Sequence, residues 1–192
     1  SIYSLFIEDE NKTLFDMFIE ENVINHKAEV EDIIKRLHNI GKVGARIHFF
    51  KVDEGVPGDG VCALYDNPNS YLRLYCIRYG TQIVILGNGG YKPKSVKKFQ
   101  EVDKLKDENY FLRKISKEIT QRIKQYVKEG EYKIQVGSKE QYQYYSFIEP
   151  QKENFAKEIE LFASNENMLE LDDNQRIIPI DHEEGLYSLS AI

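Results

Sequence analysis

The sequence predicts an α+β fold: a mainly antiparallel sheet with an N-terminal helical hairpin and a long helix after the last strand. Five apolar or alternating runs of strand length occur before residue 92, and such runs are typical of β-strands. Two helical patterns follow the first strand directly, and the longest helical pattern follows the last strand. Strand and helix do not alternate regularly, so we expect antiparallel pairing, with the helices gathered on one face of the sheet.

The first part of the chain predicts one strand and the helical hairpin. Residues 2–7 alternate and are rich in aromatic side chains, which favours a strand. Asn11 or Thr13 would cap a first helix, because either side chain can accept a hydrogen bond from a free backbone N–H group. A second helix is predicted over residues 26–39, with apolar residues on one face, and Gly41 would end it.

The other strands and the long helix follow in order. Four more strands are predicted, over residues 45–51, 61–65, 71–79 and 81–86. The last two are almost continuously apolar, which is the composition of central strands covered on both faces. The glycine-dense residues 87–90 would make a turn. A helix is predicted over residues 95–128, and Asn109 would cap its second half if the helix is divided there.

Composition indicates an ordinary globular protein with two parts. The chain has 192 residues, of which 41% are hydrophobic and 30% are charged. We expect an α+β domain over residues 1–130 and an acidic, tyrosine-containing extension over residues 131–192. No apolar run is long enough to cross a bilayer and no signal-peptide pattern opens the chain, so a cytoplasmic location is expected. Cys62 and Cys76 are expected to be reduced and buried, and neither a metal site nor a cofactor is expected.

Charge is strongly segregated along the chain. Residues 1–70 carry 7 basic and 13 acidic side chains, residues 71–128 carry 14 and 5, and residues 129–192 carry 5 and 14. The net charges of these parts are therefore −6, +9 and −9. A basic centre between acidic ends suggests internal pairing, a polyanionic partner, or both in competition.

A cationic cluster accompanies the predicted central hairpin. Arg73 and Arg78 interrupt otherwise apolar strand positions, and a buried arginine needs a carboxylate partner or a route to the surface. For either arginine alone, pairing with one of the many carboxylates is the simpler explanation. Together with a tyrosine and nearby lysines, however, they would suit a phosphate group. The other members of this cluster are Tyr91, Lys92, Lys94, Lys97, Lys98 and, on the neighbouring predicted strand, Arg46 and Lys51.

The order of these elements resembles the RelE/ParE/HigB superfamily of toxin–antitoxin toxins. The matching pieces are Leu72-Arg73-Leu74-Tyr75, then Gly80, the apolar run Ile83-Val84-Ile85-Leu86, and Gly90-Tyr91-Lys92-Pro93-Lys94, followed by a long helix. The resemblance covers about residues 1–128 as an order of elements, and residues 71–98 most closely. It implies a RelE-like fold and a RelE/HigB-like activity, in which a metal-independent endoribonuclease cuts messenger RNA at the ribosome and is held by a cognate antitoxin protein.

The resemblance also implies roles for individual residues. Arg73 and Arg78 would bind the scissile phosphate, while Lys92 and Lys94 would hold backbone phosphates or protonate the leaving oxygen. Tyr91 would stack on a base or transfer a proton. The RNA-binding residues would be Lys94, Lys97, Lys98, Arg46 and Lys51.

Three alternatives share the same fold. The first is a non-catalytic protein-interaction module, in which the arginines form internal ion pairs and the acidic extension covers the basic surface. The second is a ParE-like inhibitor of DNA gyrase, and the third gives residues 131–192 the role of a built-in neutraliser. An exposed, concave surface shared by Arg73, Arg78, Tyr91 and Lys92 would favour the enzyme, whereas scattered or internally paired side chains would favour the module. The oligomeric state is left open by the sequence.

Overall fold

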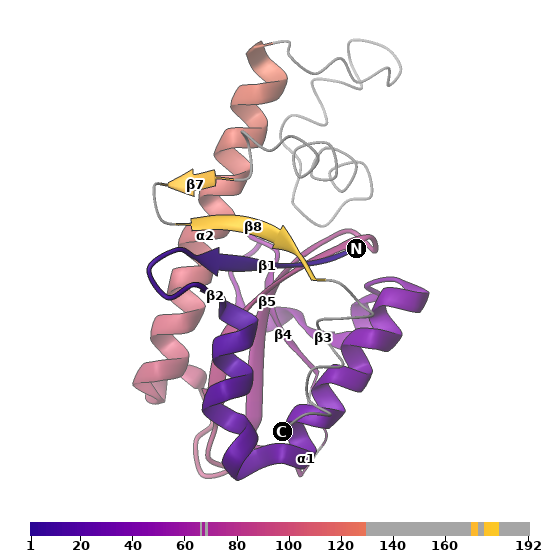
Figure 1. The fold of residues 1–192 in the computed structure, drawn as a ribbon. Helices are drawn as coiled ribbons and strands as arrows, with labels where there is room; N and C mark the ends of the chain where they lie inside the picture. Colours follow the sequence, from indigo (N-terminus) through magenta and orange to yellow (C-terminus); the bar gives the residue numbers. More distant parts are fainter. Residues whose placement is uncertain (66, 68, 130–169, 173–174, 181–192) are drawn as a thin grey trace.

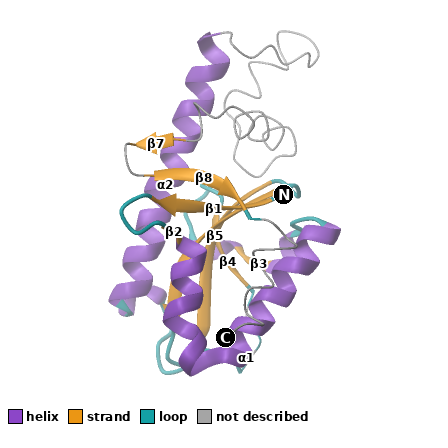
Figure 2. Ribbon diagram, viewed as in Figure 1, coloured by secondary structure: helices purple, strands orange, loops and turns teal. Residues whose placement is uncertain are grey.

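The protein folds around one mixed sheet, whose strands run through the middle of Figure 1. This is a computed structural model, and it describes residues 1–65, 67, 69–129, 170–172 and 175–180. Two long helices, α1 (Leu14–Val43) and α2 (Asp103–Glu129), accompany the sheet (Figure 2). Its strands are β1 (Ile2–Ile7), β2 (Lys12–Thr13), β3 (Phe50–Lys51), β4 (Val61–Leu64), β5 (Leu72–Tyr79), β6 (Ile83–Tyr91), β7 (Glu170–Asp172) and β8 (Gln175–Pro179).

The predicted α+β class with a mainly antiparallel sheet is confirmed. The strands lie in the order β3-β4-β5-β6-β1-β8-β7, and β2 pairs with β1. Strand β1 runs parallel to β6, while the other pairs are antiparallel. The predicted hairpin of β5 and β6 lies inside the sheet, between β4 and β1.

The helices cover both faces of the sheet, so the prediction that they gather on one face is wrong. Leu37 and Ile40 of α1 belong to a cluster with the even-numbered residues of β5, such as Leu74. Leu112 of α2 belongs to a second cluster with the odd-numbered residues, such as Tyr75. All eight residues of β5 are buried. An apolar strand of this kind needs a cover on each side, because successive side chains point to opposite faces.

Helix α1 consists of two arms joined at His26, whose φ of −135° and ψ of 36° are not helical (Figure 1). These arms correspond to the predicted helical hairpin. Thr13 caps the first arm as expected, because its hydroxyl accepts from the Asp16 N–H group and the Asp16 carboxylate accepts from the Thr13 N–H group. The second arm ends at Gly44, with φ 86°, and not at Gly41 as predicted.

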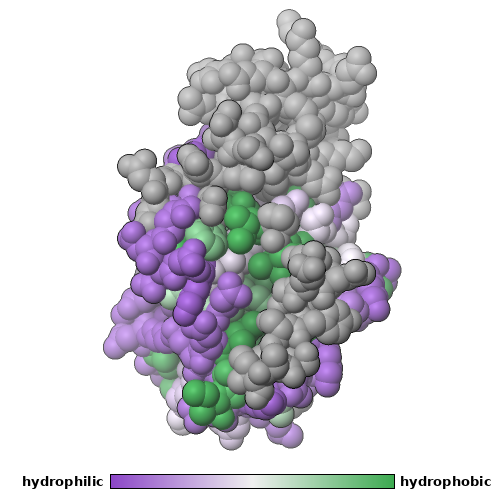
Figure 3. Space-filling view, in the orientation of Figure 1, coloured by the Kyte–Doolittle hydropathy of each residue, from purple (hydrophilic) through white to green (hydrophobic). Residues whose placement is uncertain are grey.

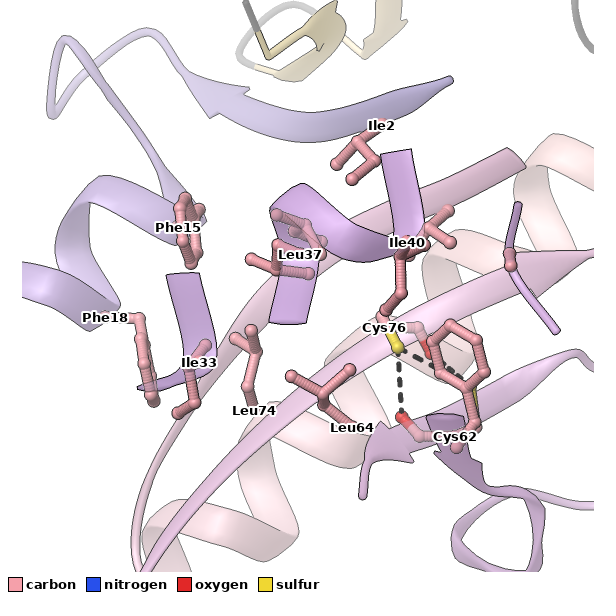
Figure 4. Packing of buried hydrophobic residues seen from close by; sticks show 14 of the residues in the cluster. Ile2, Phe15, Phe18, Ile33, Leu37, Ile40, Cys62, Leu64, Leu74 and Cys76 are labelled. Atoms are coloured by element: carbon pink, nitrogen blue, oxygen red, sulfur yellow. Dashed lines mark hydrogen bonds between the residues drawn. The ribbon is translucent and has the colours of Figure 1, made fainter. Parts of the chain in front are cut away.

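Apolar side chains of α1 are buried against the sheet. Figure 3 shows an apolar strip between the two arms and hydrophilic residues to either side of it. Figure 4 shows the cluster beneath, where Phe15 and Leu37 of α1 meet Leu74 of β5. Cys62 and Cys76 lie directly opposite each other at the edge of this cluster. Their sulfur atoms are 3.5 Å apart, and both thiols are free and buried, as the sequence predicts.

Three predicted elements differ from the observed ones. Of the predicted strand at residues 45–51, only β3 forms, because residues Ile47–Phe49 make a turn of 3-10 helix. Residues 87–90 do not form a turn but belong to β6, which continues to Tyr91. Asn109 does not cap a helix; it is buried within α2, which begins at Asp103 after a 3-10 turn.

Part of the predicted acidic extension belongs to the sheet. Strand β8 pairs with β1, and its Ile177 is buried in the cluster beneath α2. Strand β8 thus lies beyond the predicted boundary near residue 130, yet it is part of the sheet that the preceding residues form. Residues 131–169 of the predicted tyrosine-containing extension lie outside the described residues. Among the described helices, none is both long and apolar enough to span a membrane.

Candidate functional site

Arg73 lies on β5, on the face that α2 covers, and only 5% of the residue is exposed. Its guanidinium group pairs with the carboxylate of Glu54, whose side chain is 13% exposed. The Asn109 side chain on α2 donates a hydrogen bond of 2.8 Å to the Glu54 carbonyl oxygen. The loop after β3 and the helix α2 thus hold Glu54 against Arg73.

Glu54 ends the 3-10 turn that follows β3, and its side chain is largely buried. Burial raises the pKa of its carboxyl group, while the charges of Arg73, Lys51 and Lys92 act to lower it and that of Asp53 raises it further. Burial and the charge of Glu54 likewise raise the pKa of the Tyr75 hydroxyl. We call Glu54, Arg73, Lys51 and Lys92 the Glu54 cluster.

The Glu54 cluster combines a carboxyl group that retains its proton more readily than usual with three cations. Such a set can move a proton and stabilise negative charge on a phosphate. Glu54 Oε2 is buried and has no hydrogen-bond partner among the described residues. Arg73 is also buried, so the exposed side of the cluster is formed by the half-buried Lys51 and Lys92.

Arg78 points to the other face of the sheet. Its Nε–H donates a hydrogen bond of 2.7 Å to the Ala45 carbonyl oxygen, and its guanidinium lies 5.8 Å from the centre of the Phe50 ring. The residue is 6% exposed, and burial lowers the pKa of its guanidinium. Arg73 and Arg78 are five positions apart on one strand, so their side chains point in opposite directions. The structure does not bring them together at one phosphate.

Tyr91, by contrast, lies on an exposed aromatic ladder at the end of the central hairpin. Its ring stacks on that of Tyr71 and on that of His26, with 5.4 Å between ring centres in each pair. The ammonium group of Lys94 lies 5.1 Å from the centre of the Tyr71 ring. Tyr91 is 46% exposed and Tyr71 is 37% exposed. We call His26, Tyr71, Tyr91 and Lys94 the stacked edge.

The strand register explains why the stacked edge forms. Leu72 of β5 is opposite Tyr91 of β6, and the Lys92 N–H group donates to the Tyr71 carbonyl oxygen. The two tyrosines therefore extend from neighbouring strand ends. His26 reaches them from the kink of α1, where the sequence predicts only the start of the second helix. Sequence reasoning missed Tyr71 and His26, since their contact depends on a pairing between distant segments.

The other predicted RNA-binding residues are more dispersed. The Lys92 ammonium donates to the Val96 carbonyl oxygen at 2.5 Å, and the Lys51 ammonium lies 5.2 Å from the centre of the Tyr65 ring. Three further residues are exposed. Arg46 precedes the 3-10 turn at residues 47–49, and Lys97 and Lys98 lie in the loop after β6. Of the predicted residues, Tyr91 and Lys94 thus lie on the stacked edge, and Arg73, Lys51 and Lys92 lie in the Glu54 cluster. Four others belong to neither: Arg46, Arg78, Lys97 and Lys98.

Glu29 of α1 fixes the backbone beneath the stacked edge. Its Oε2 atom accepts hydrogen bonds from the Ser70 hydroxyl at 2.7 Å, the Tyr71 N–H at 2.6 Å and the Leu72 N–H at 2.9 Å. Burial would raise the pKa of Glu29, but these hydrogen bonds and the charge of His26 outweigh it and lower the pKa. The carboxylate is therefore the form that the fold stabilises.

Replacing Glu29 by alanine should lower the free energy of unfolding by about 1–2 kcal/mol at pH 7, since three donors lose a charged acceptor. The pKa is lower in the folded protein, so this stabilisation is present above the unfolded pKa and is lost as the pH falls through the folded pKa. Urea unfolding should therefore show a smaller difference between wild type and Glu29→Ala at pH 3 than at pH 7. Glu31→Ala, an exposed change on the same helix, is the matched control; a difference that does not depend on pH would contradict this role of Glu29.

No group of three or more His, Cys, Asp or Glu residues that could hold a metal occurs in the part of the chain that the structure describes. Comparison with known proteins gives no further guide to the site: no family model, no curated protein and no solved structure matches this chain.

Proposed function

We propose that this chain is an RNA-directed toxin of the RelE/HigB kind, and that it binds single-stranded RNA at the stacked edge. The observation that carries the proposal is the stack of Tyr71 and Tyr91, both exposed, with the Lys94 ammonium over one ring. Unpaired bases stack on aromatic rings whatever their sequence, and a neighbouring lysine can contact the phosphate.

The geometry of the stacked edge suits an unpaired base. Tyr91 is covered on both sides by His26 and Tyr71, so a base would extend the ladder at one of its ends. Each base stacked on an aromatic side chain contributes roughly 1–3 kcal/mol to binding. The net charge of +9 over residues 71–128 adds a sequence-independent attraction to the RNA backbone.

RNA cleavage is the second part of the proposal, and the Glu54 cluster is the group of residues suited to it. In this reaction the ribose 2′-oxygen forms a bond to phosphorus and the bond from phosphorus to the 5′-oxygen breaks. One group takes the proton of the 2′-hydroxyl and another supplies a proton to the leaving oxygen. The carboxyl group of Glu54 would move a proton, and Lys51 and Lys92 would contact the phosphate, where their charges stabilise the transition state.

A non-catalytic interaction module is the second candidate. It is favoured by the burial of both arginines, since Arg73 pairs with Glu54 and Arg78 donates to Ala45. In this case both guanidinium groups stabilise the fold, and the exposed residues contact a partner without chemistry. A partner covering the stacked edge would still make Tyr91 and Lys94 important.

Induced expression in bacteria separates these functions. The full chain should arrest growth and yield transcripts ending in a cyclic phosphate, and Tyr71→Ala combined with Lys94→Gln should abolish both effects. The matched control is Lys35→Gln with Lys42→Gln, which changes two exposed lysines of α1 and should retain them. Growth arrest without cleaved transcripts would favour the interaction module. Normal growth in the presence of a well-folded wild-type chain would contradict the proposed toxin function.

A further inference from the structure

We infer that a groove between α2 and the loop before β4 is a second phosphate-contact site for the same RNA; this inference rests on the proposed function. The groove lies beyond the stacked edge and the Glu54 cluster and shares no residue with them. Among the residues that line it are Asp59, Arg113, Lys114, Ser116, Lys117 and Thr120.

The charged side chains of the groove leave a net positive charge. One carboxylate and three cations line it, which gives a net charge of +2. The Asp59 carboxylate is already bound within the protein. It accepts hydrogen bonds from the N–H groups of Val56 at 3.0 Å and Val61 at 2.9 Å, and it pairs with Arg113 at 3.4 Å. Lys114 and Lys117 are exposed and form no ion pair with a described carboxylate. The ammonium groups of Lys114 and Lys117 are therefore the charges in the groove that can contact a phosphate.

The loop that forms one wall of the groove is fixed in place. Besides its two backbone contacts, the Asp59 side chain packs so closely on Gly55 that a Cβ atom there would lie 2.4 Å from Asp59 Oδ1. The Ser116 hydroxyl of α2 donates a hydrogen bond to the Asp59 carbonyl oxygen. Loop and helix are thus joined before any ligand binds, so binding an anion there would require little ordering.

The position of the groove indicates a strand of several nucleotides. Strand β5 begins next to the stacked edge at Leu72 and ends at Tyr79, and the Arg78 N–H group bonds to Gly60 beside the groove loop. A strand of eight residues spans about 26 Å, at roughly 3.3 Å per residue. At roughly 3.4 Å per nucleotide in a stacked strand, at least about eight nucleotides are needed to contact both places.

The test compares short and long RNA with the full chain. Fluorescence anisotropy would measure the affinity of an unstructured RNA of about five nucleotides and one of about fifteen, chosen to fall on either side of this minimum, from low to moderate salt. The variants are Lys114→Gln with Lys117→Gln and, as the matched control, Lys35→Gln with Lys42→Gln. For the longer RNA, the groove variant should lower the slope of log affinity against log salt by about 1.4, at roughly 0.7 per phosphate contact of a single strand. The short RNA should bind both variants as it binds wild type.

The outcomes of this test are distinct. A wild-type slope for the longer RNA in the groove variant overturns the second site and leaves the proposed function standing. An equal change for both RNA lengths also overturns it, because the lysines would then belong to the first contact. Failure of the wild-type chain to bind either RNA refutes the proposed function, and the second site with it.

Discussion

Replacing Arg73 by methionine should lower the free energy of unfolding by about 3–5 kcal/mol, because it leaves the carboxylate of Glu54 buried without its cation. The ion pair joins β5 to the loop after β3, and Asn109 of α2 donates a hydrogen bond to the Glu54 carbonyl oxygen in that loop. Urea unfolding followed by circular dichroism would measure the effect. The double variant Arg73→Met with Glu54→Leu should recover much of the loss, since replacing both partners by apolar groups removes the buried charge.

The loss of stability in the Arg73→Met variant should depend on pH in a defined direction. The pKa of Glu54 is already raised by burial, and removal of Arg73 takes away a charge that lowers it. A carboxyl group with a raised folded pKa retains its proton in the folded protein, so stability falls as the pH rises through that pKa. Arg73→Met should therefore be less destabilised at pH 5 than at pH 8. A loss below about 1 kcal/mol, or the opposite pH trend, would contradict a structural role for the pair.

Gly89→Ala should be the most damaging single change in the central hairpin. A Cβ atom at Gly89 would lie 1.8 Å from the backbone carbonyl oxygen of Arg73 and 2.9 Å from its carbonyl carbon. Both are main-chain atoms of β5, so no rotamer change relieves the clash and the two strands must separate. We expect a loss at or above the upper end of the roughly 1–3 kcal/mol typical of overpacked cores, measured as a lower urea midpoint.

Gly87→Ala is the matched control for this prediction. Its Cβ atom would meet side-chain atoms of Leu112 at 3.0 Å and a carbonyl oxygen at 3.3 Å. The leucine side chain can move, so the loss should be smaller than for Gly89→Ala. A Gly89→Ala variant as stable as Gly87→Ala would contradict the close approach of β5 and β6.

The hairpin also shows how far sequence could predict the fold. Apolar composition located β5 and the first part of β6, because continuous runs of such residues form buried strands. The glycines after Leu86 were interpreted as a turn, although they continue β6 across an irregularity in its register with β5. Whether glycine permits a turn or a close approach of two strands depends on the partner strand, which a single sequence does not reveal.

The candidate site was predicted less well than the fold, and one signal was available. Arg73 and Arg78 are an odd number of positions apart, so strand periodicity alone places them on opposite faces. Their shared charge suggests one group only when the alternation of side chains along the strand is left out. The partner Glu54 and the contact of His26 with Tyr91 depend on how distant segments meet. No local pattern indicates either contact.

The affinity for a short, unstructured single-stranded RNA tests the central claim most directly. Tyr71→Ala with Lys94→Gln, which removes one end ring of the ladder and the cation beside it, should weaken binding by about 5-fold to 150-fold, which corresponds to the roughly 1–3 kcal/mol of one stacked base. Tyr110→Ala, which removes a tyrosine of α2 that is 49% exposed, should bind as wild type does. Equal affinity of wild type and the stacked-edge variant, with both well folded, would contradict the assignment of the stacked edge as the RNA-binding surface.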